Sequence, residues 1–450
     1  VIAIAALSAA VTVEALGATL KVSNKISGIC DEAAYVKDIA ANIRRQVSSA
    51  QERQESLAQS AFKWQLAAAL EHRPTDAAAK TALSLLLRNR ARALEGEIKA
   101  KAPVLQETAT LLESRATALL TARKLQPTAA PTKTSAAKSD ETGLFGGAGA
   151  GCTVTMTPTT SSSVCDLTKI NGAEIGQEEP PGHDKNQVKL VQDVYLKPRT
   201  ITAKALAKGA ASTHGGLTDP TTKDCAGSAN GRSTEANFLG ADVTYSDSDP
   251  ASVTATSLGT VTGNQLTCGD TKDMKDYTDS TQAKTANAIC TGLTTNMALQ
   301  EDLGETDGQA LSAMTDLQPI AEQLLFSREE LAAIPSEQRP QKIKEKIREV
   351  YGKGPNDFKT NYLKVLTTKV SYNLGKQNVN EDINTIVQKP EAEVILAYFE
   401  GINYNRKQKK ALKRNLKIRA QIKKTQRRNQ ATVTIRRKKK TLSNLRAEAF

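Results

Sequence analysis

The chain has 450 residues, of which 39% are hydrophobic, and its formal net charge is +13. This length allows one large domain or two to three ordinary ones, and the hydrophobic content excludes a generically disordered chain. Residues 406–450 hold 18 Lys and Arg against Glu448, a net charge of +17, which leaves −4 for residues 1–405. The body is therefore mildly acidic and the basicity belongs to one appendage, which argues against a nucleic-acid surface on the main fold.

The first residues, "VIAIAALSAAVTVEALGA" (1–18), form an apolar run that is too short to span a bilayer. It ends in small residues spaced like a signal-peptidase site, and cleavage is expected after Ala15 or Ala18. The initiating Met and a basic leader are absent, so we expect a signal peptide that is truncated at its start. A buried apolar strand or helix start is the alternative.

Six cysteines follow this run. Behind a secretory signal they favour three disulfides, although the sequence alone leaves fifteen connectivities open. No two of them form a CxxC pair and the chain has three histidines, so a structural zinc site is not expected. Free buried cysteines are the alternative. The six are Cys30, Cys152, Cys165, Cys225, Cys268 and Cys290.

Residues 28–124 predict two long helices joined by a tight turn at "HRPTD" (72–76). Apolar residues recur at steps of three, four and seven along each helix, which is the spacing of a coiled-coil seam. Thr75 or Asp76 is expected to cap the second helix. The first seam is Val36, Ile39, Ile43, Val47, Ala50, Leu57, Ala61, Trp64 and Ala68, and the second is Ile98, Ala102, Leu105, Ala109, Leu112, Ala116 and Leu119.

Residues 126–282 change in character, being rich in Thr, Ser, Gly, Asp and Pro and poor in aromatic residues. Such a segment cannot fold on hydrophobic burial alone, so we expect cysteine-stapled loops with a few short strands. The strand candidates are "KLVQDVYL" (189–196) and "DVTYSD" (242–247).

Helical periodicity returns in residues 283–405. The stretches "QAKTANAICTGLTTNMAL" (282–299) and "DGQALSAMTDLQPIAEQLLF" (307–326) predict helices, and three or four shorter helices punctuated by Pro and Gly follow. The fold class is therefore mainly α.

The sequence shows no catalytic constellation, so we expect no enzyme, no cofactor and no metal site. "GGAGAG" (146–151) is as glycine-rich as a dinucleotide loop, but it follows no strand and opens no helix, so a flexible linker is the better interpretation. His72, His183 and His214 stand in unrelated contexts. No Asn lies in an Asn-x-Ser/Thr site, so any glycan on these residues must be O-linked.

The order of these parts resembles one family. The matching pieces are "SGICDEAAYVKDIAANI" at the start of the first helix, "GAGAGCTVT" after the hairpin, "VYGKGPNDFKTNYLKVL", and "EAEVILAYFEG" in the closing helix. Over residues 19–405 the chain resembles the class A N-terminal domain of the variant surface glycoproteins (VSGs) of African trypanosomes.

The resemblance implies an elongated antiparallel coiled-coil hairpin with a disulfide-stapled loop and short-strand top lobe and shorter C-terminal helices. It divides the chain into a signal peptide (1–18), an N-terminal domain (19–405) and an atypical basic tail (406–450). Within the domain lie the hairpin (28–124), the variable lobe (126–282) and the returning helices (283–405). It also implies the pairs Cys30–Cys165, Cys152–Cys225 and Cys268–Cys290.

The function that the resemblance implies is a dense protective coat on the outer face of the plasma membrane, with antigenic variation and evasion of host immunity. The partners would be a second copy in a homodimer, with a trimer possible, and host antibodies, with no specific nucleic acid. Intact relatives are held to the membrane by a GPI anchor, whose signal is not present in this sequence. A ligand-binding receptor on the same scaffold, such as a transferrin-receptor subunit or a serum-resistance protein, is the alternative function. A nucleic-acid binder acting through the tail is a further alternative, which a secreted body does not favour.

The basic tail, "KKALKRNLKIRAQIKKTQRRNQATVTIRRKKK" (409–440), stands where relatives have a Glu/Lys-rich linker followed by cysteines. We interpret it as the product of a displaced reading frame. A solvated basic linker and a polyanion-binding tail, which would hold phosphates by charge alone, remain open.

Overall fold

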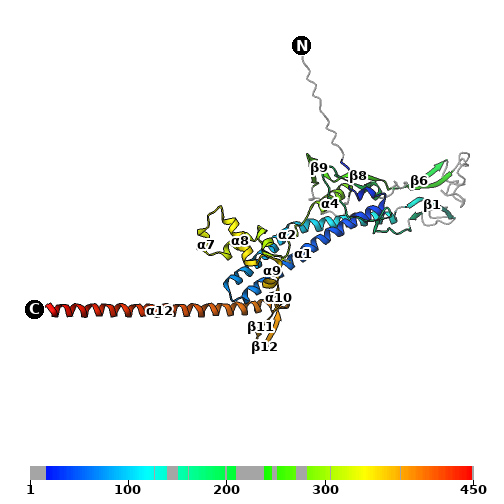
Figure 1. Ribbon diagram of the computed structural model, residues 1–450. Helices are drawn as coiled ribbons and strands as arrows, with labels where there is room; N and C mark the ends of the chain where they lie inside the picture. The colour runs from blue at the N-terminus through cyan, green and yellow to red at the C-terminus, as the bar shows by residue number, and fades with distance from the viewer. Residues whose placement is uncertain are drawn as a thin grey trace, which may run out of the picture. The chain divides into compact units, whose positions relative to one another are not determined.

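The computed structural model has a mainly α fold, as the sequence predicts (Figure 1). Its described residues are 17–125, 127–138, 151–160, 162–197, 200–208, 238–245, 251–269, 281–304, 306–375 and 377–447.

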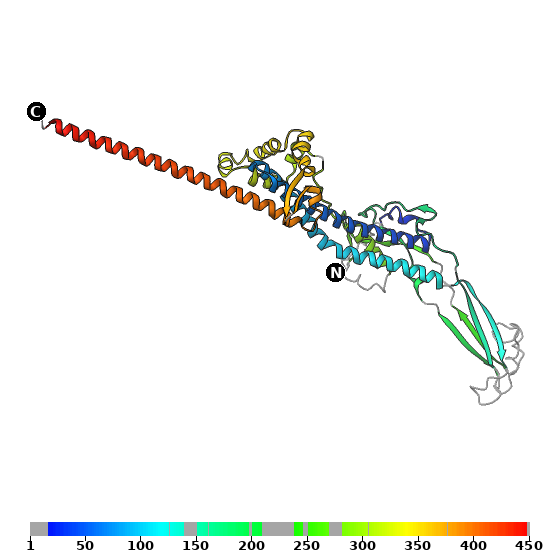
Figure 2. The same ribbon diagram turned by 90° about the horizontal axis from the view of Figure 1, so that it is seen from below.

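Two long helices, α1 (Ile29–Leu70) and α2 (Pro74–Leu125), form the predicted hairpin and run side by side in both views (Figures 1 and 2). The predicted seam residues are buried almost throughout, because apolar groups repeated every 3.5 residues stay on the face that meets the other helix. Ala68 and Ile98 are the exceptions, being half-buried. Those with at most 6% exposure are Val36, Ile39, Ile43, Val47, Ala50, Leu57, Ala61, Trp64, Ala102, Leu105, Ala109, Leu112, Ala116 and Leu119.

The start of α2 differs from the expected cap at Thr75 or Asp76. The helix begins at Pro74, and the Ala77 N–H already donates to the Arg73 carbonyl, so both expected caps lie inside the first turn. Proline favours the first helical position because its missing N–H would have no helical partner there and its fixed φ suits a helix.

The chain divides into two compact units that both include part of the hairpin. The first comprises residues 1–50 and 97–298, and the second comprises residues 51–96 and 299–450.

The described part of the first unit contains most of the strands, the α-helix α4 (Gln282–Thr294) and short 3₁₀ helices, one of them at Ser23–Lys25. The predicted strand at 189–196 is shorter than expected, since it ends at Val191 and a 3₁₀ helix follows at Asp193–Leu196. The predicted strand at 242–247 overlaps β7 over residues 242–245, and residues 246 and 247 lie outside the described residues. The strands are β1 (Pro127–Lys138), β2 (Gly151–Thr160), β3 (Lys169–Ile170), β4 (Ala173–Glu174), β5 (Gln187–Val191), β6 (Ile201–Lys208), β7 (Phe238–Tyr245), β8 (Val253–Ser257), β9 (Gly259–Thr262) and β10 (Gln265–Cys268).

These strands form antiparallel two-stranded sheets: β1 with β2, β3 with β4, β5 with β8, β6 with β7, and β9 with β10. The β1–β2 and β6–β7 ribbons lie side by side and are longer than the short strands that the sequence predicts (Figure 2). Gly151, the last residue of the "GGAGAG" segment, begins β2, and residues 146–150 lie outside the described residues. A small core forms where Val191 and Tyr195 pack against Leu119 of α2.

The second unit contains short helices and one hairpin of strands. The hairpin, β11 (Lys369–Leu374) with β12 (Gln377–Asp382), corrects the expectation of helices alone in this region. Gly375 makes its turn at φ +61°, a backbone conformation that only glycine adopts at little cost. The helices are α5 (Gly308–Ala313), α6 (Gln318–Leu325), α7 (Arg328–Ala333), α8 (Arg339–Tyr351), α9 (Pro355–Phe358), a π-turn (Lys359–Leu363), α10 (Lys364–Thr367), α11 (Ile383–Ile386) and α12 (Ala392–Ala447).

An aromatic cluster forms the core of the second unit. Trp64 of α1 contacts Phe358 and Tyr362, whose rings stack at 5.1 Å between centroids. The buried hydroxyl of Tyr351 donates to the Ala79 carbonyl of α2 over 2.8 Å, so this polar atom is satisfied. The cluster therefore joins the hairpin to α8 and α9 by apolar burial and a main-chain hydrogen bond.

The closing helix and the basic tail form one continuous helix, α12, of 56 residues. Phe399 and Ile395 are buried in its first part, whereas the described side chains beyond Arg406 are exposed. The exposure of these described side chains is in keeping with the Lys and Arg content of this part of the helix.

Candidate functional site

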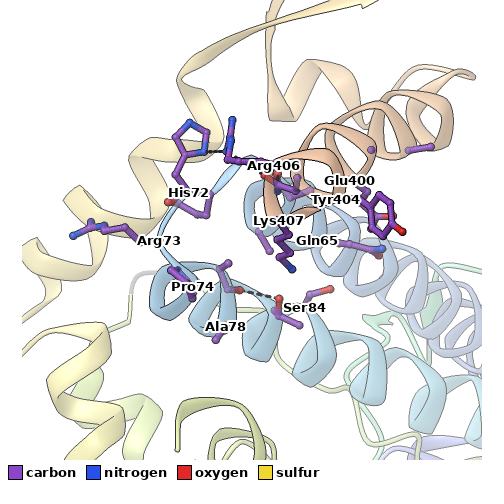
Figure 3. A pocket seen from close by; sticks show the side chains of 18 of the residues that line it. Gln65, His72, Arg73, Pro74, Ala78, Ser84, Glu400, Tyr404, Arg406 and Lys407 are labelled. Carbon is purple, nitrogen blue, oxygen red and sulfur yellow. Dashed lines mark hydrogen bonds between the residues drawn. The ribbon is translucent and has the colours of Figure 1, made fainter. Parts of the chain in front are cut away.

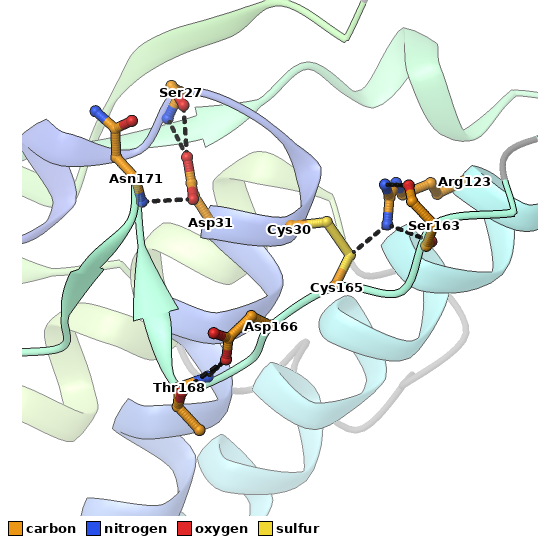
Figure 4. Close-up of a disulfide and its surroundings, with 9 residues drawn as sticks. All are labelled: Ser27, Cys30, Asp31, Arg123, Ser163, Cys165, Asp166, Thr168 and Asn171. Atoms are coloured by element: carbon orange, nitrogen blue, oxygen red, sulfur yellow. Dashed lines mark hydrogen bonds between the residues drawn. A yellow bond between two sulfur atoms is a disulfide. The ribbon is translucent and has the colours of Figure 1, made fainter.

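Two disulfides lie among the described residues of the first unit, and one of them joins the start of α1 to the segment after β2 (Figure 4). Cys30 and Cys165 are bonded with a Cα–Cα distance of 5.2 Å. Arg123, near the end of α2, donates to the Cys165 sulfur over 2.8 Å and to the Ser163 carbonyl over 3.2 Å. The bridge and this arginine together fix one segment of the lobe to both helices of the hairpin.

Next to this bridge, Asp31 collects three hydrogen bonds at the first turn of α1 (Figure 4). It accepts from the Ser27 N–H and hydroxyl over 3.0 and 2.6 Å, and from the Asn171 N–H over 2.8 Å. Asn171 and Gly172 both have positive φ and form the two-residue turn of the β3–β4 hairpin. Asn-Gly is the favoured sequence for such a turn, so "NG" was a signal for this hairpin that sequence reasoning missed.

The second disulfide joins Cys268, at the end of β10, to Cys290 of α4. Cys290 is fully buried. Two residues further along α4, Gly292 packs so closely that an added Cβ would lie 2.4 Å from the Ile43 Cδ1 atom of α1. An added Cβ would therefore require the Ile43 side chain to shift, and glycine lets α4 approach the hairpin closely without that shift.

Cys152 and Cys225 are the remaining pair that the resemblance implies. The Cys225 position and the Cys152 side chain lie outside the described residues, so this pair stays a prediction.

A buried ionic network lies at the centre of the first unit. Arg115 of α2 and Glu32 of α1 both have 0% side-chain exposure, and the Arg115 Nε atom donates to Glu32 over 2.8 Å. The same guanidinium donates to Asp193 over 2.8 Å and to the Val191 carbonyl over 2.6 Å. Glu32 in turn accepts from the Val191 N–H. The network therefore binds both helices to the end of β5.

The network extends to α4 through Asp193. Both of its carboxylate oxygens accept from the Gln282 N–H at the start of α4, over 2.9 and 3.0 Å. A carboxylate at a helix N-terminus is favourable because it bonds a free N–H and meets the positive end of the helix dipole. Burial raises the pKa of Glu32, and the charge and hydrogen bond of Arg115 act against that rise.

Sequence reasoning missed this network, although a signal for it exists. Arg115 stands three residues after Leu112 and four before Leu119, and Glu32 stands four before Val36. Both charges therefore fall on the apolar face of their helices, where an ionised group needs a partner. What the sequence does not show is that Arg115 and Glu32, which are 83 residues apart, are each other's partners.

The histidines and acidic residues of the described ranges form no metal centre. Within those ranges, no three or more His, Cys, Asp or Glu side chains gather where a metal ion could be held. His183 is exposed beside Asp184, His72 contacts Arg406 in the second unit, and His214 lies outside the described ranges. Across those same ranges, no helix has both the length and the apolar character to span a membrane.

Comparison with known proteins gives one informative sequence match, and no protein-family model matches the chain. The chain is 24% identical over 399 residues to the variant surface glycoprotein ILTAT 1.22 of Trypanosoma brucei brucei, an alignment that covers 86% of this chain and 80% of the relative.

The fold is similar to solved variant surface glycoprotein structures. VSGsur bound to suramin superposes with a TM-score of 0.63 at 21% identity, over 84% of this chain and 99% of that chain. A second VSGsur structure superposes with a TM-score of 0.58 at 19% identity and the same coverage. Sequence similarity and fold both agree with the resemblance drawn from the sequence: the chain is similar in sequence to a variant surface glycoprotein and has the fold of the solved variant surface glycoprotein structures.

Proposed function

We propose that this chain is a surface-coat glycoprotein that forms a dense protective coat and takes part in antigenic variation and evasion of host immunity. The observation that carries the proposal is the similarity to a variant surface glycoprotein over 86% of the chain, together with the shared fold. Its role is mechanical and immunological, without catalysis.

The structure supports this proposal through the way the lobe is attached. In the first unit, the Cys30–Cys165 bridge and the Glu32–Arg115–Asp193 network hold the lobe segments against the hairpin. Loops that are fixed at their bases can differ in sequence at their tips without loosening the scaffold. We assign the variable epitopes to residues 126–282 and the spacing of the coat to the helices.

The proposed location is the extracellular face of the plasma membrane, reached through the secretory pathway. The intact protein would be held there by a GPI anchor as in its relatives, and it would act as a homodimer, with a trimer as the other assembly. Light scattering of the purified chain at several concentrations measures that assembly directly, and a monomer at every concentration contradicts it.

Expression of the intact gene in bloodstream trypanosomes, as the active coat gene, tests the proposal. Antibodies raised against the purified chain are expected to stain living, unpermeabilised cells uniformly, and brief trypsin treatment is expected to remove the signal. Retention of the protein inside cells that make it in quantity would overturn the proposal. An unrelated coat protein expressed from the same locus is the matched control.

The second candidate is a ligand-binding receptor on the same scaffold. It is favoured by one similar structure, that of VSGsur bound to suramin, in which this kind of fold holds a small molecule. Transferrin is the discriminating probe, because binding in the micromolar range or tighter, about −8 kcal/mol, would replace the coat function by a receptor function.

A further inference from the structure

A cavity of about 1020 Å³ lies in the second unit, between the turn of the hairpin and the first part of α12 (Figure 3). Its size is at the upper end of the range of about 300–1,000 Å³ that is usual for small-molecule sites. Small side chains line this cavity both at the hairpin turn and on α12, and they leave its space unfilled. They are Ala68, Ala69, Ala77, Ala78, Ala397 and Gly401.

The charged side chains around this cavity are mostly cationic. Five cations face two carboxylates, a net charge of +3 with His72 neutral. The cations are Arg73, Arg88, Arg406, Lys407 and Lys410, and the carboxylates are Glu71 and Glu400.

Two ion pairs involve residues of the cavity wall, but they leave its net positive charge in place. Glu71 is already bound to Lys80, and Arg73 to Asp76, so these four groups cancel in pairs. Among the residues that line the cavity, Glu400 is then the carboxylate left to face the remaining four cations.

The four remaining cations bind neutral partners or none among the described residues. Arg88 donates to the Gln65 amide oxygen. Arg406 donates to the Asn403 amide oxygen over 3.2 Å and contacts His72 Nδ1 at 2.6 Å. Lys407 and Lys410 are exposed and have no ion-pair partner within the described ranges. Half-buried guanidinium groups that lack a carboxylate are suited to bind an anion, because their paired N–H groups match phosphate oxygens.

We propose that this cavity binds a small, multiply charged anion carrying phosphate groups, held by Arg88 from α2 and by Arg406, Lys407 and Lys410 from α12. Tyr404, 63% exposed on the lining, offers a ring against which an organic part of such a ligand can pack. The proposal does not rest on the coat function. It also gives the first residues of the basic tail a specific role.

Isothermal titration of the full chain with inorganic tripolyphosphate, at about 0.15 M salt to screen diffuse attraction, tests the proposal. One site per chain is expected. The double variant Arg88→Gln/Arg406→Gln is expected to weaken binding about tenfold or more, because it removes two charge-assisted contacts. Lys407→Gln/Lys410→Gln, which changes exposed residues and leaves packing intact, is expected to weaken binding in the same direction.

The matched control is Lys423→Gln/Lys424→Gln, which removes the same charge further along α12, away from the cavity. Its affinity is expected to stay near that of the unaltered chain. Equal weakening by all three double variants would overturn the proposal in favour of diffuse attraction to the tail, as would the absence of binding. A second titration with ATP measures the contribution of an organic group, and binding weaker than that of tripolyphosphate would overturn the role given to Tyr404.

Discussion

The Nε atom of Arg115 lies 2.8 Å from a carboxylate oxygen of Glu32, and neither side chain has any exposure to solvent. The arginine also binds Asp193 and the Val191 carbonyl. Its planar guanidinium therefore connects α2 to α1, to the end of β5 and to the 3₁₀ helix that follows β5. Removing one member of a buried ion pair leaves the other charge without compensation in a low-dielectric surrounding, which is more costly than the pair is favourable.

We therefore predict that Arg115→Met lowers the free energy of unfolding by about 3–5 kcal/mol. Arg44→Met is the matched control, since Arg44 pairs with Glu113 between the same two helices at 2.7 Å but with 46% and 42% side-chain exposure. It is expected to cost less than about 1 kcal/mol. Urea unfolding followed by circular dichroism measures both, and equal losses would contradict the role of burial.

The two disulfides are predicted to contribute unequally to stability. Cys30–Cys165 joins residues 135 apart in sequence, and Cys268–Cys290 joins residues 22 apart. The chain-entropy relation gives about 5 kcal/mol for the long loop and about 3 kcal/mol for the short one. The variants Cys30→Ser/Cys165→Ser and Cys268→Ser/Cys290→Ser, unfolded in urea without reductant, are expected to lose stability in that order. The reverse order would show that the local bridge does more than restrict the unfolded chain.

The processing site is predicted to lie after Ala15 rather than after Ala18. The Ala18 N–H donates to the Asp184 carbonyl over 2.7 Å, and the Ala18 carbonyl accepts from the Gln187 N–H over 3.4 Å. Cleavage after Ala18 would remove both bonds and expose the edge of β5 beside them. Mass spectrometry of the secreted protein is expected to find Leu16 at the N-terminus, and a start at Thr19 would refute this assignment.

A pH dependence is predicted at Glu381 of β12. Lys389 contacts both of its carboxylate oxygens, at 2.6 and 2.7 Å, and Tyr372 donates to it over 2.8 Å. The hydrogen bond from Lys389, followed by that from Tyr372, lowers the pKa of Glu381 below its ordinary value of 4.5. Because the folded-state pKa is the lower one, its stabilising effect is present above pH 4.5 and is lost as the pH falls through the folded-state value.

We expect Glu381→Gln to be less stable than the unaltered chain near neutral pH, and the difference to shrink as the pH falls toward about 3. Trp64, the single tryptophan of the chain, lies 2% exposed in the second unit and reports unfolding by its emission. Glu55→Gln is the control, since Glu55 has no hydrogen-bond or ion-pair partner in the part of the chain that the structure describes. A difference that does not change with pH would contradict the assignment.

The helical hairpin could be predicted from sequence because its information is local. The seam residues of α1 and α2 repeat every three to four positions, so the sequence of each helix by itself indicates which face is buried. The β1–β2 ribbon could not be predicted, because "PTAAPTKTSAAK" carries no alternation of large apolar residues and 12 residues separate its end from the start of its pairing partner. The β11–β12 hairpin follows a helical stretch directly, and Gly375 was its one visible turn signal.

The candidate site divides in the same way. The six cysteines are plain in the sequence, whereas the resemblance was needed to propose how they pair. The contact between Glu32 and Arg115 depends on the rotational setting of two helices, which no single helix specifies. The cavity between the hairpin turn and α12 depends on segments more than 300 residues apart, such as His72 and Arg406.

Beside the Cys30–Cys165 bridge and the Arg115–Asp193 ion pair, the hairpin binds the lobe through main-chain atoms of the lobe. Arg115 and Glu32 bind the carbonyl and N–H of Val191, and Asp31 binds the N–H of Asn171. A backbone N–H or carbonyl is the same whichever side chain the residue carries, so these bonds set few demands on the identity of the gripped residue. Under the coat function that we propose, the side chains of the lobe residues at these contacts can change while charged residues on the two helices keep the same main-chain bonds.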